Sequence, residues 1–211
     1  MRLIVVTDRA LAAPREVLDV IEAALAAGAP AVQLRDKTAD AATLFEAARA
    51  LRELTHRWSA LLFVNDRVDV ALAVQADGAH LGPDDLPVAA VRARVPSGFL
   101  LGYSTDDPAE ARRAADAGAD YIGCGAVYAT GTKTDAGAPI GLMRLDEVAR
   151  SVSIPVVAIG GITPERASEV ARTRAAGIAV VGAVMSYADP GAVVRSLLAP
   201  FAARRPEPAT D

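Results

Sequence analysis

The sequence predicts an α/β protein that folds as a compact, single-domain (βα)8 TIM barrel over residues 1–202. Two observations predict this fold. Eight short apolar segments alternate with eight alanine-rich segments of helical character, which is the repeat of such a barrel. The chain has 211 residues, enough for one barrel near the lower end of its size range. The segment 203–211 contains two arginines and two prolines, and we expect it to be a disordered tail.

The predicted strands are four to six residues long and mostly apolar, as expected for parallel strands covered on both faces. They are Leu3–Thr7, Ala31–Arg35, Leu61–Asn65, Ala79–Gly82, Phe99–Ser104, Asp120–Gly123, Pro155–Gly160 and Ile178–Gly182. The main competing architecture is an open, doubly wound sheet, which has fewer strands and a glycine-rich turn after the first one. Here Asp8 and Arg9 follow the first strand, so the barrel is favoured.

The predicted helices lie between these strands. They are Pro14–Ala27, Asp40–Arg57, Arg67–Ala76, Pro87–Arg94, Pro108–Ala117, Leu142–Ser151, Pro164–Thr173 and Pro190–Leu198. A glycine precedes every second strand, at Gly28, Gly78, Gly118 and Gly177. Because glycine just past a helix end supplies the left-handed residue that closes the helix, we expect all four to be helix caps.

Charge and composition exclude several classes of protein. The 22 Lys and Arg residues against 26 Asp and Glu give a net charge of −4, which does not suit a general nucleic-acid binder. One cysteine allows neither an intramolecular disulfide nor a cysteine-rich zinc site. The apolar start is interrupted by Asp8 and Arg9, and no uncharged run approaches the roughly 18 residues of a membrane span. We therefore expect a cytoplasmic protein without nucleic-acid or membrane partners; a homo-oligomer is left open.

The rarest polar residues gather where this fold places its active site. The chain has only two lysines, Lys37 and Lys133, one asparagine, Asn65, and two glutamines. Arginine replaces lysine on a solvated surface at little cost, so lysines in an arginine-rich chain are informative. Active sites of (βα)8 barrels lie at the carboxyl ends of the strands. Both lysines, Asn65 and Gln33 fall at those ends or in the loops beyond them, so we expect a ligand site there.

The end of the second strand carries three donor side chains in alternation. Gln33, Arg35 and Lys37 alternate with Leu34 and Asp36, and residues two apart on an extended backbone face the same way. Arginine binds phosphate with its planar fork and lysine adds a point charge. This pattern predicts binding of a phosphorylated ligand; the alternative is a solvated strand end with a local ion pair.

Two carboxylates end neighbouring strands, Asp66 after the third and Asp85 after the fourth. Two carboxylates suit Mg2+, which keeps several waters and takes phosphate oxygens as further ligands. The alternative is that either aspartate caps a helix. Zinc is not expected, because His56, His80 and Cys124 have no ligand spacing. His80 lies within a strand, so we expect it to be a core residue or to support the site from behind and not to act in catalysis. Cys124 has no neighbouring base, so we expect it to be a packing residue.

Glycines follow the last two strands. Gly160-Gly161 precedes a helix start at Thr163, and Val181-Gly182 follows the eighth strand. Phosphate sites of barrels commonly lie after strands seven and eight, where backbone N–H groups are available. We therefore expect a phosphate site here; the alternative is a tight turn followed by a helix cap.

A long loop, residues 126–141, contains Thr130-Gly131-Thr132-Lys133. Loops of this length are usually functional. In a nucleotide-triphosphate loop the lysine directly follows the glycine and a helix begins at once. Thr132 intervenes here, so this loop is not of that kind.

Seven segments in chain order resemble the thiamine-phosphate synthase family, over about residues 3–185. They are Val32-Gln33-Leu34-Arg35-Asp36-Lys37, Asn65-Asp66-Arg67, Ala76-Asp77-Gly78-Ala79-His80-Leu81-Gly82 with Asp85, Gly102-Tyr103-Ser104, Asp120-Tyr121-Ile122-Gly123, Thr130-Gly131-Thr132-Lys133 and Ala158-Ile159-Gly160-Gly161-Ile162. The resemblance implies a transferase that joins 4-amino-5-hydroxymethyl-2-methylpyrimidine diphosphate (here, pyrimidine diphosphate) to a thiazole phosphate, giving thiamine phosphate and diphosphate.

The resemblance also implies a role for each matching residue. The pyrimidine diphosphate would be held by Gln33, Leu34, Arg35, Asp36, Lys37, Asn65, Ser104 and Lys133. Four of these would act in catalysis: Arg35, Lys37, Ser104 and Lys133. The thiazole phosphate would be held by Thr130, Gly131, Thr132, Gly161, Val181 and Gly182. The cofactor would be Mg2+, held by Asp66 and Asp85; Mn2+ is left open.

The sequence departs from the family pattern at three positions. Pro83 stands where relatives often have glutamine, Gly182 where they often have serine, and Asp106 where many have histidine. The resemblance also implies that the sister thiazole tautomerases use a histidine at this position as a base. Asp106 therefore favours the synthase. Two alternatives stay open: a metal-independent thiazole tautomerase, and a non-catalytic sensor of phosphorylated ligands. The preferred thiazole tautomer and any closure of the loop 126–141 over substrate are also left open.

Overall fold

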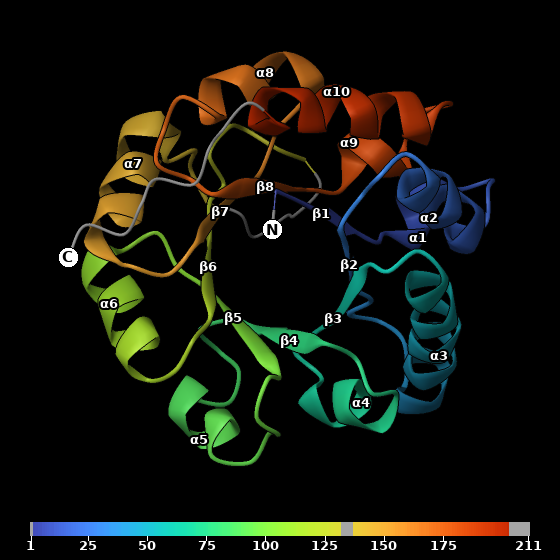
Figure 1. The fold of residues 1–211 in the computed structure, drawn as a ribbon, viewed down its shortest axis with the longest axis horizontal. Helices are drawn as coiled ribbons and strands as arrows, with labels where there is room; N and C mark the ends of the chain where they lie inside the picture. Colours follow the sequence, from blue (N-terminus) through green and yellow to red (C-terminus); the bar gives the residue numbers. More distant parts are fainter. Residues whose placement is uncertain (1, 132–136, 203–211) are drawn as a thin grey trace.

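The computed structural model describes residues 2–131 and 137–202. Within these ranges eight parallel strands close into a barrel, in which each strand pairs with the next and β8 pairs with β1. Helices surround the barrel on its outside (Figure 1). The strands are β1 (Leu3–Val6), β2 (Ala31–Leu34), β3 (Leu61–Asn65), β4 (Gly78–Leu81), β5 (Leu100–Ser104), β6 (Tyr121–Cys124), β7 (Val156–Ile159) and β8 (Gly177–Val180). The predicted barrel is confirmed; the predicted tail, 203–211, lies outside the described residues.

All eight predicted helices are present, and residues 2–131 and 137–202 contain two further short helices, α1 and α9, that were not predicted. The helices are α1 (Arg9–Ala12), α2 (Val17–Ala26), α3 (Ala41–Arg57), α4 (Val68–Ala73), α5 (Val88–Arg92), α6 (Pro108–Asp116), α7 (Gly141–Ser151), α8 (Pro164–Val170), α9 (Gly182–Met185) and α10 (Pro190–Ala202). In the part of the chain that the structure describes, none of them is long and apolar enough to span a membrane.

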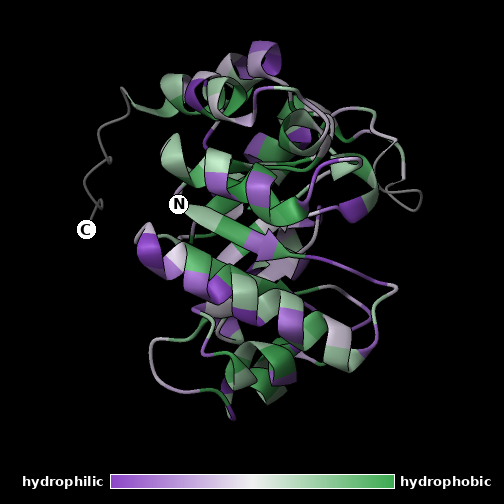
Figure 2. Cartoon of the chain, turned by 90° about the vertical axis from the view of Figure 1, so that its right-hand side faces the viewer, coloured by the Kyte–Doolittle hydropathy of each residue, from purple (hydrophilic) through white to green (hydrophobic). Residues whose placement is uncertain are grey.

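Aspartate caps explain where several helices begin. The side chains of Asp8, Asp40 and Asp107 accept hydrogen bonds from backbone N–H groups in the first turns of α1, α3 and α6. Such caps satisfy N–H groups that have no acceptor inside the helix. Hydrophobic and hydrophilic residues alternate along the helices that cover the barrel, and α3 buries one stripe against the strands (Figure 2).

The strands divide their side chains between two buried layers. On β1, Leu3 and Val5 pack toward the helices, whereas Ile4 and Val6 point into the barrel. The interior layer also contains Phe63 and Tyr121, whose rings meet edge to face with centroids 5.5 Å apart. These side chains fill the barrel and leave its carboxyl end open.

The glycine pattern before the even strands was interpreted correctly at only two positions. Gly28 and Gly118 have φ of +96° and +100° and close helices as predicted. The prediction was wrong for Gly78 and Gly177, which are the first residues of β4 and β8. A Cβ atom on Gly78 would lie 2.2 Å from the carbonyl oxygen of Leu100, so close strand packing explains this glycine.

Candidate active site

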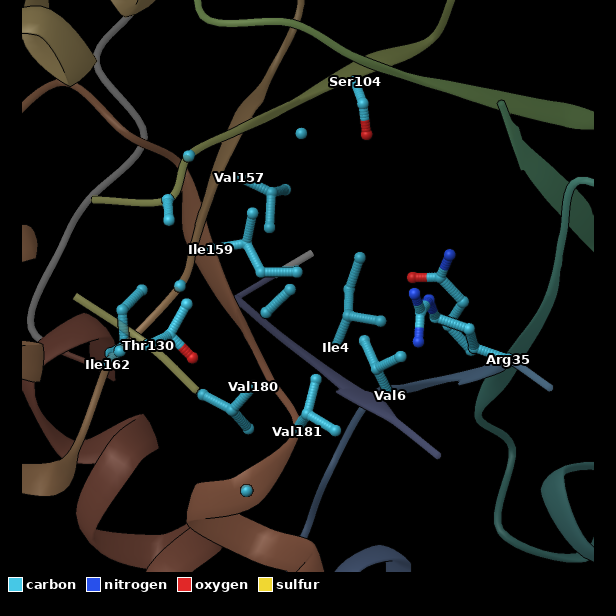
Figure 3. Close-up of a pocket in the computed structure, with 18 of the residues that line it drawn as sticks. Ile4, Val6, Arg35, Ser104, Thr130, Val157, Ile159, Ile162, Val180 and Val181 are labelled. Atoms are coloured by element: carbon cyan, nitrogen blue, oxygen red, sulfur yellow. The ribbon is translucent and has the colours of Figure 1, made fainter. Parts of the chain in front are cut away.

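A cavity of about 680 Å³ opens at the carboxyl ends of the strands (Figure 3). Every strand of the barrel contributes to its lining. Ile4 and Val6 of β1 lie beside Arg35, which follows the neighbouring strand β2, and Ser104 of β5 lies apart from them across the cavity (Figure 3). The site therefore lies where the fold predicts it.

The end of β2 turns alternate side chains toward this cavity. Gln33, Arg35 and Lys37 all line it. Leu34 is buried against the outer helices instead. The Asp36 carboxylate accepts hydrogen bonds from the Thr38 and Ala39 N–H groups, both at 3.0 Å, and lies 3.4 Å from Arg9. The period of two along a strand thus brings together three of the five residues predicted here and directs the side chains of Leu34 and Asp36 elsewhere.

Neighbouring polar residues hold these side chains in place. The side-chain amide of buried Gln33 donates to the Asn65 Oδ1 atom at 3.0 Å, across the β2–β3 pair. The N–H group of Arg35 donates to the Thr7 hydroxyl oxygen at 2.9 Å. The Gln33 carbonyl oxygen and the Asn65 amino group are therefore oriented for a ligand.

Asp66 and Asp85 form a carboxylate pair at the rim. Burial raises the pKa of Asp66 to about 6, and the hydrogen bond and negative charge of Asp85 act in the same direction. Lys37 and Arg35 oppose this shift through their positive charges, so both cations lie near the pair. Asp85 Oδ2 also accepts from the Gly82 N–H group at 2.7 Å.

This pair fits a magnesium ion better than a zinc ion. Neither aspartate caps a helix, because the N-cap residues of α4 and α5 are Arg67 and Pro87, and neither helix has a side-chain cap hydrogen bond. Among the described residues no cluster of three or more His, Cys, Asp or Glu side chains suits a metal. Zinc requires at least three such ligands, whereas Mg2+ commonly takes one or two carboxylates and completes its shell with water and phosphate oxygens.

The wall from β6 to β8 is lined mainly by backbone and apolar side chains, together with the polar side chains of Thr130, Thr163 and Arg166. Val157, Ile159, Ile162, Val180 and Val181 lie together on this side (Figure 3). Gly160, Gly161 and Gly182 also line it, and glycine offers a ligand only backbone atoms.

Two of these glycines have conformations that other residues rarely adopt. Gly160 and Gly161 have φ of +99° and +63°. A Cβ atom on Gly161 would lie 2.6 Å from the carbonyl oxygen of Ala129. The turn after β7 therefore packs directly against the start of the β6–α7 loop, which carries Thr130.

The loop 126–141 is only partly within the described residues. Thr130 and Gly131 line the cavity as predicted, whereas Thr132 and Lys133 lie outside the described residues. Its base is fixed by hydrogen bonds from Val127 N–H to the Ile159 carbonyl oxygen and from Ile140 N–H to that of Ala126, each 2.9 Å.

Sequence reasoning missed Arg166, which lines the cavity from the first turn of α8. Its guanidinium group donates to the Gly161 carbonyl oxygen at 2.7 Å and lies 4.6 Å from the centroid of the Tyr128 ring. The Tyr128 hydroxyl donates in turn to Glu169 at 2.7 Å. The sequence signal that could have identified Arg166 is its position just after the β7 glycines, because first-turn residues of barrel helices face the site.

Cys124 lies in the core as expected, whereas His80 is only half-buried and lines the cavity. Cys124 is fully buried, and burial raises the pKa of its thiol to about 12, which does not suit a nucleophile. His80 lies between two hydroxyl groups: its Nε2 atom is 2.7 Å from Ser104 Oγ and its Nδ1 atom is 2.9 Å from the Tyr121 hydroxyl oxygen.

The fold and the cavity define a (βα)8-barrel enzyme with its site at the carboxyl ends of the strands. A sequence profile described as thiamine monophosphate synthase matches residues 3–184. That match covers most of the chain, and the chain therefore belongs to the thiamine monophosphate synthase family.

Individual relatives agree with this assignment. Thiamine-phosphate synthase of Chloroflexus aurantiacus is 52% identical over 198 residues, which are 94% of this chain and 91% of that protein. The enzyme of the same name from Roseiflexus castenholzii is 46% identical over 193 residues, 92% of this chain and 85% of that one. The solved structure of thiamine phosphate pyrophosphorylase from Pyrococcus furiosus has 42% identity and a TM-score of 0.87, covering 95% of both chains.

Proposed function

We propose that the chain is a thiamine-phosphate synthase, a transferase that couples the pyrimidine diphosphate to the thiazole phosphate and releases diphosphate. The observation that carries this proposal is the division of one cavity into two halves: one with cations and a carboxylate pair, from β2 to β5, and one that is mainly apolar and backbone-lined and contains Arg166, from β6 to β8. The reaction brings together two phosphorylated substrates, and one of them loses its diphosphate. Two different halves of one cavity suit these two substrates. The chain's similarity to synthases supports the same reaction.

The charged half is assigned to the pyrimidine diphosphate. Arg35 and Lys37 carry the positive charge, and Gln33, Asn65 and Ser104 supply uncharged hydrogen-bonding groups. Lys133 of the β6–α7 loop is proposed as the third cation. A unit charge about 4 Å from a developing negative charge is worth roughly 4 kcal/mol at an effective dielectric constant of 20. Cations in these positions would therefore stabilise the leaving diphosphate.

Asp66 and Asp85 are proposed to hold Mg2+. Their mutual repulsion and partial burial favour a divalent cation between them. When bound, the ion would supply positive charge to the diphosphate oxygens. Arg35 and Lys37, close to Asp66, would complete the neutralisation of the substrate's negative charge.

The other half is assigned to the thiazole phosphate. Its phosphate group would contact Thr130, Gly131, Thr132, Gly161, Val181 and Gly182. Backbone N–H groups bind phosphate without adding charge, and the apolar wall of β7 and β8 suits a thiazole ring. Binding here would hold the ring nitrogen toward the methylene carbon of the pyrimidine substrate.

The reaction is proposed to be a dissociative substitution. The bond between the methylene carbon and the diphosphate oxygen breaks, and the diphosphate keeps the electron pair. The resulting pyrimidine methylene cation is stabilised by the amino group of its ring. The thiazole nitrogen then donates its lone pair and forms the new carbon–nitrogen bond. No proton has to be removed from the attacking nitrogen, so positioning and charge do most of the work.

The test is to mix both substrates with the protein, with and without Mg2+, and to measure diphosphate release. A synthase releases diphosphate only with both substrates and the ion. A thiazole tautomerase would isomerise the thiazole phosphate in excess chelator and leave the pyrimidine diphosphate unused. A sensor would be thermally stabilised by thiazole phosphate without any turnover. We also propose that the protein works in the cytoplasm on these small molecules alone.

A further inference from the structure

We propose that His80 and Tyr121 are positioning residues that fix the Ser104 hydroxyl as a hydrogen-bond donor toward the pyrimidine diphosphate. The identity of that ligand rests on the proposed function; the hydrogen-bond order itself does not. The three side chains form a chain across β4, β5 and β6. Tyr121 contacts His80 Nδ1 at 2.9 Å, and His80 Nε2 contacts Ser104 Oγ at 2.7 Å.

Two glycines make room for the histidine ring inside the barrel. His80 is paired in register with Gly102, and Gly102 with Tyr121. A Cβ atom on Gly102 would lie 2.4 Å from His80 Nδ1 and 2.5 Å from the Tyr121 hydroxyl oxygen. A Cβ atom on Gly123 would lie 2.9 Å from His80 Cε1. Any other residue at either position would displace the ring, so this arrangement depends on both glycines.

The Tyr121 hydroxyl determines which atoms donate and which accept in these hydrogen bonds. The residue is only 1% exposed, and burial holds the pKa of its hydroxyl far above the ordinary value, so the phenol keeps its proton. In the described part of the structure, the one hydrogen-bond partner of this hydroxyl is His80 Nδ1. Buried hydroxyl groups donate their hydrogen to an acceptor. His80 Nδ1 is therefore the acceptor and carries no hydrogen.

The remaining hydrogens follow from this assignment. A neutral imidazole with a bare Nδ1 carries its hydrogen on Nε2. His80 Nε2 therefore donates to Ser104 Oγ, which acts as the acceptor. The opposite tautomer, or a cationic ring, would leave the Tyr121 hydrogen buried without an acceptor among the described residues, which is unfavourable.

The Ser104 hydroxyl is thereby fixed as a hydrogen-bond donor toward the cavity. Its Oγ atom has no hydrogen-bond partner other than His80 within the described residues, and the residue lines the cavity. Because Oγ accepts from His80, its own hydrogen is available to a ligand. A donor at this point matches a phosphate oxygen or a ring nitrogen of the substrate and disfavours an amino group. Tyr121 and His80, which also line the cavity, thus contribute to substrate orientation through Ser104.

The tautomer can be measured directly by 15N NMR on the ligand-free protein. The chain has two histidines, so a His56→Gln variant leaves His80 as the single signal. We expect a neutral ring with the proton on Nε2 near neutral pH. Protonation at Nδ1, or at both nitrogens, would overturn the proposal. This outcome does not depend on the reaction catalysed: failure of the proposed function would appear separately, as absence of diphosphate release by the unaltered protein.

A double-mutant cycle tests the connection to Ser104. We expect Tyr121→Phe to lower kcat/KM for the pyrimidine diphosphate by about 5- to 10-fold, the size of one hydrogen bond. In a Ser104→Ala background the same change should have less than about a 2-fold effect, because the group it orients is gone. Equal losses in both backgrounds would indicate a merely structural role and contradict the proposal.

Tyr103→Phe is the matched control. The Tyr103 hydroxyl donates to Glu110 at 2.9 Å on the same strand as Ser104, but the residue does not line the cavity. It should therefore leave kcat/KM within about 2-fold of the unaltered value. If Tyr103→Phe lowered kcat/KM as much as Tyr121→Phe, the loss would come from a weakened barrel and not from the hydrogen bond to His80.

Discussion

The two halves of the cavity are built from different materials. From β2 to β5 the ligand meets ionisable and amide side chains, among them Arg35, Lys37, Asp66 and Asp85. From β6 to β8 it meets mainly glycine backbone and aliphatic side chains, with Thr130 and Arg166 beside them (Figure 3). The first half supplies charge, whereas the second supplies shape and backbone donors. Substitutions in the charged half should therefore lower kcat, and those in the backbone half should raise KM for one substrate.

The largest effect is expected from Asp66→Asn. The carboxylate pair loses one charge, and we expect diphosphate release at saturating substrates to fall by more than about 100-fold. Asp66 has a φ of +61°, a conformation that asparagine also tolerates, so the backbone is kept. Removing one of two repelling carboxylates should leave the thermal unfolding midpoint unchanged or raised. Near-native turnover would contradict the role of this half.

Lys37→Ala should lower kcat by about 100-fold, because one cation beside the diphosphate is lost. The matched control is Arg49→Ala on α3, whose exposed guanidinium pairs with Glu46 at 2.8 Å and Glu53 at 3.0 Å. An exposed ion pair of this kind contributes little to stability or activity. If both variants turned over equally fast, the charged half would have no special part in the reaction.

Gly161→Ala should act mainly on the thiazole phosphate. The new methyl group would lie 2.6 Å from the Ala129 carbonyl oxygen at a φ of +63°. We expect KM for the thiazole phosphate to rise by about 10-fold, with KM for the pyrimidine diphosphate nearly unchanged. Gly28→Ala is the control. Gly28 has a φ of +96°, but a Cβ atom added there would have no non-neighbouring atom within 4 Å. This substitution should therefore lower the free energy of unfolding by about 1 kcal/mol and leave both KM values unchanged. A parallel rise in both KM values would remove the distinction between the halves.

The smallest effect is expected from Arg166→Lys. Lysine keeps the positive charge but loses the planar group that lies over Tyr128 and holds the Gly161 carbonyl oxygen. KM for the thiazole phosphate should rise by about 3-fold, measured under the same conditions as for Gly161→Ala. If the lysine variant matched the unaltered protein while Arg166→Met did not, charge and not positioning would be the contribution of Arg166.

The same contrast explains how much could be predicted from the sequence. The strands were recognised because they are buried on both faces, and the charged half because rare ionisable residues such as Lys37 and Asp66 end them. The sequence also predicted that Gly161 and Gly182 lie at the site, and both line the cavity. It did not reveal α9 or Arg166, because short helices and first-turn contacts depend on how loops pack in three dimensions.

Errors at single positions have equally local causes. Leu34 and Asp36 lie within the matching segment, but the strand period turns their side chains away from the cavity. Gly78 follows a helix as a cap would, yet Gln75 takes the left-handed conformation there, with a φ of +54°. A glycine required by strand packing and one required by a turn look alike in a sequence.

The glycines beside His80 tie its size to that of its neighbours. An alanine at residue 123 would meet the imidazole, whereas one at residue 102 would meet both the imidazole and the Tyr121 ring, whose Cζ atom would lie 2.2 Å away. Among homologous chains, a larger residue 102 should therefore occur only where residues 80 and 121 are both smaller. A smaller residue 80 alone would allow alanine at residue 123 only, with a narrower and more rigid barrel interior as the result.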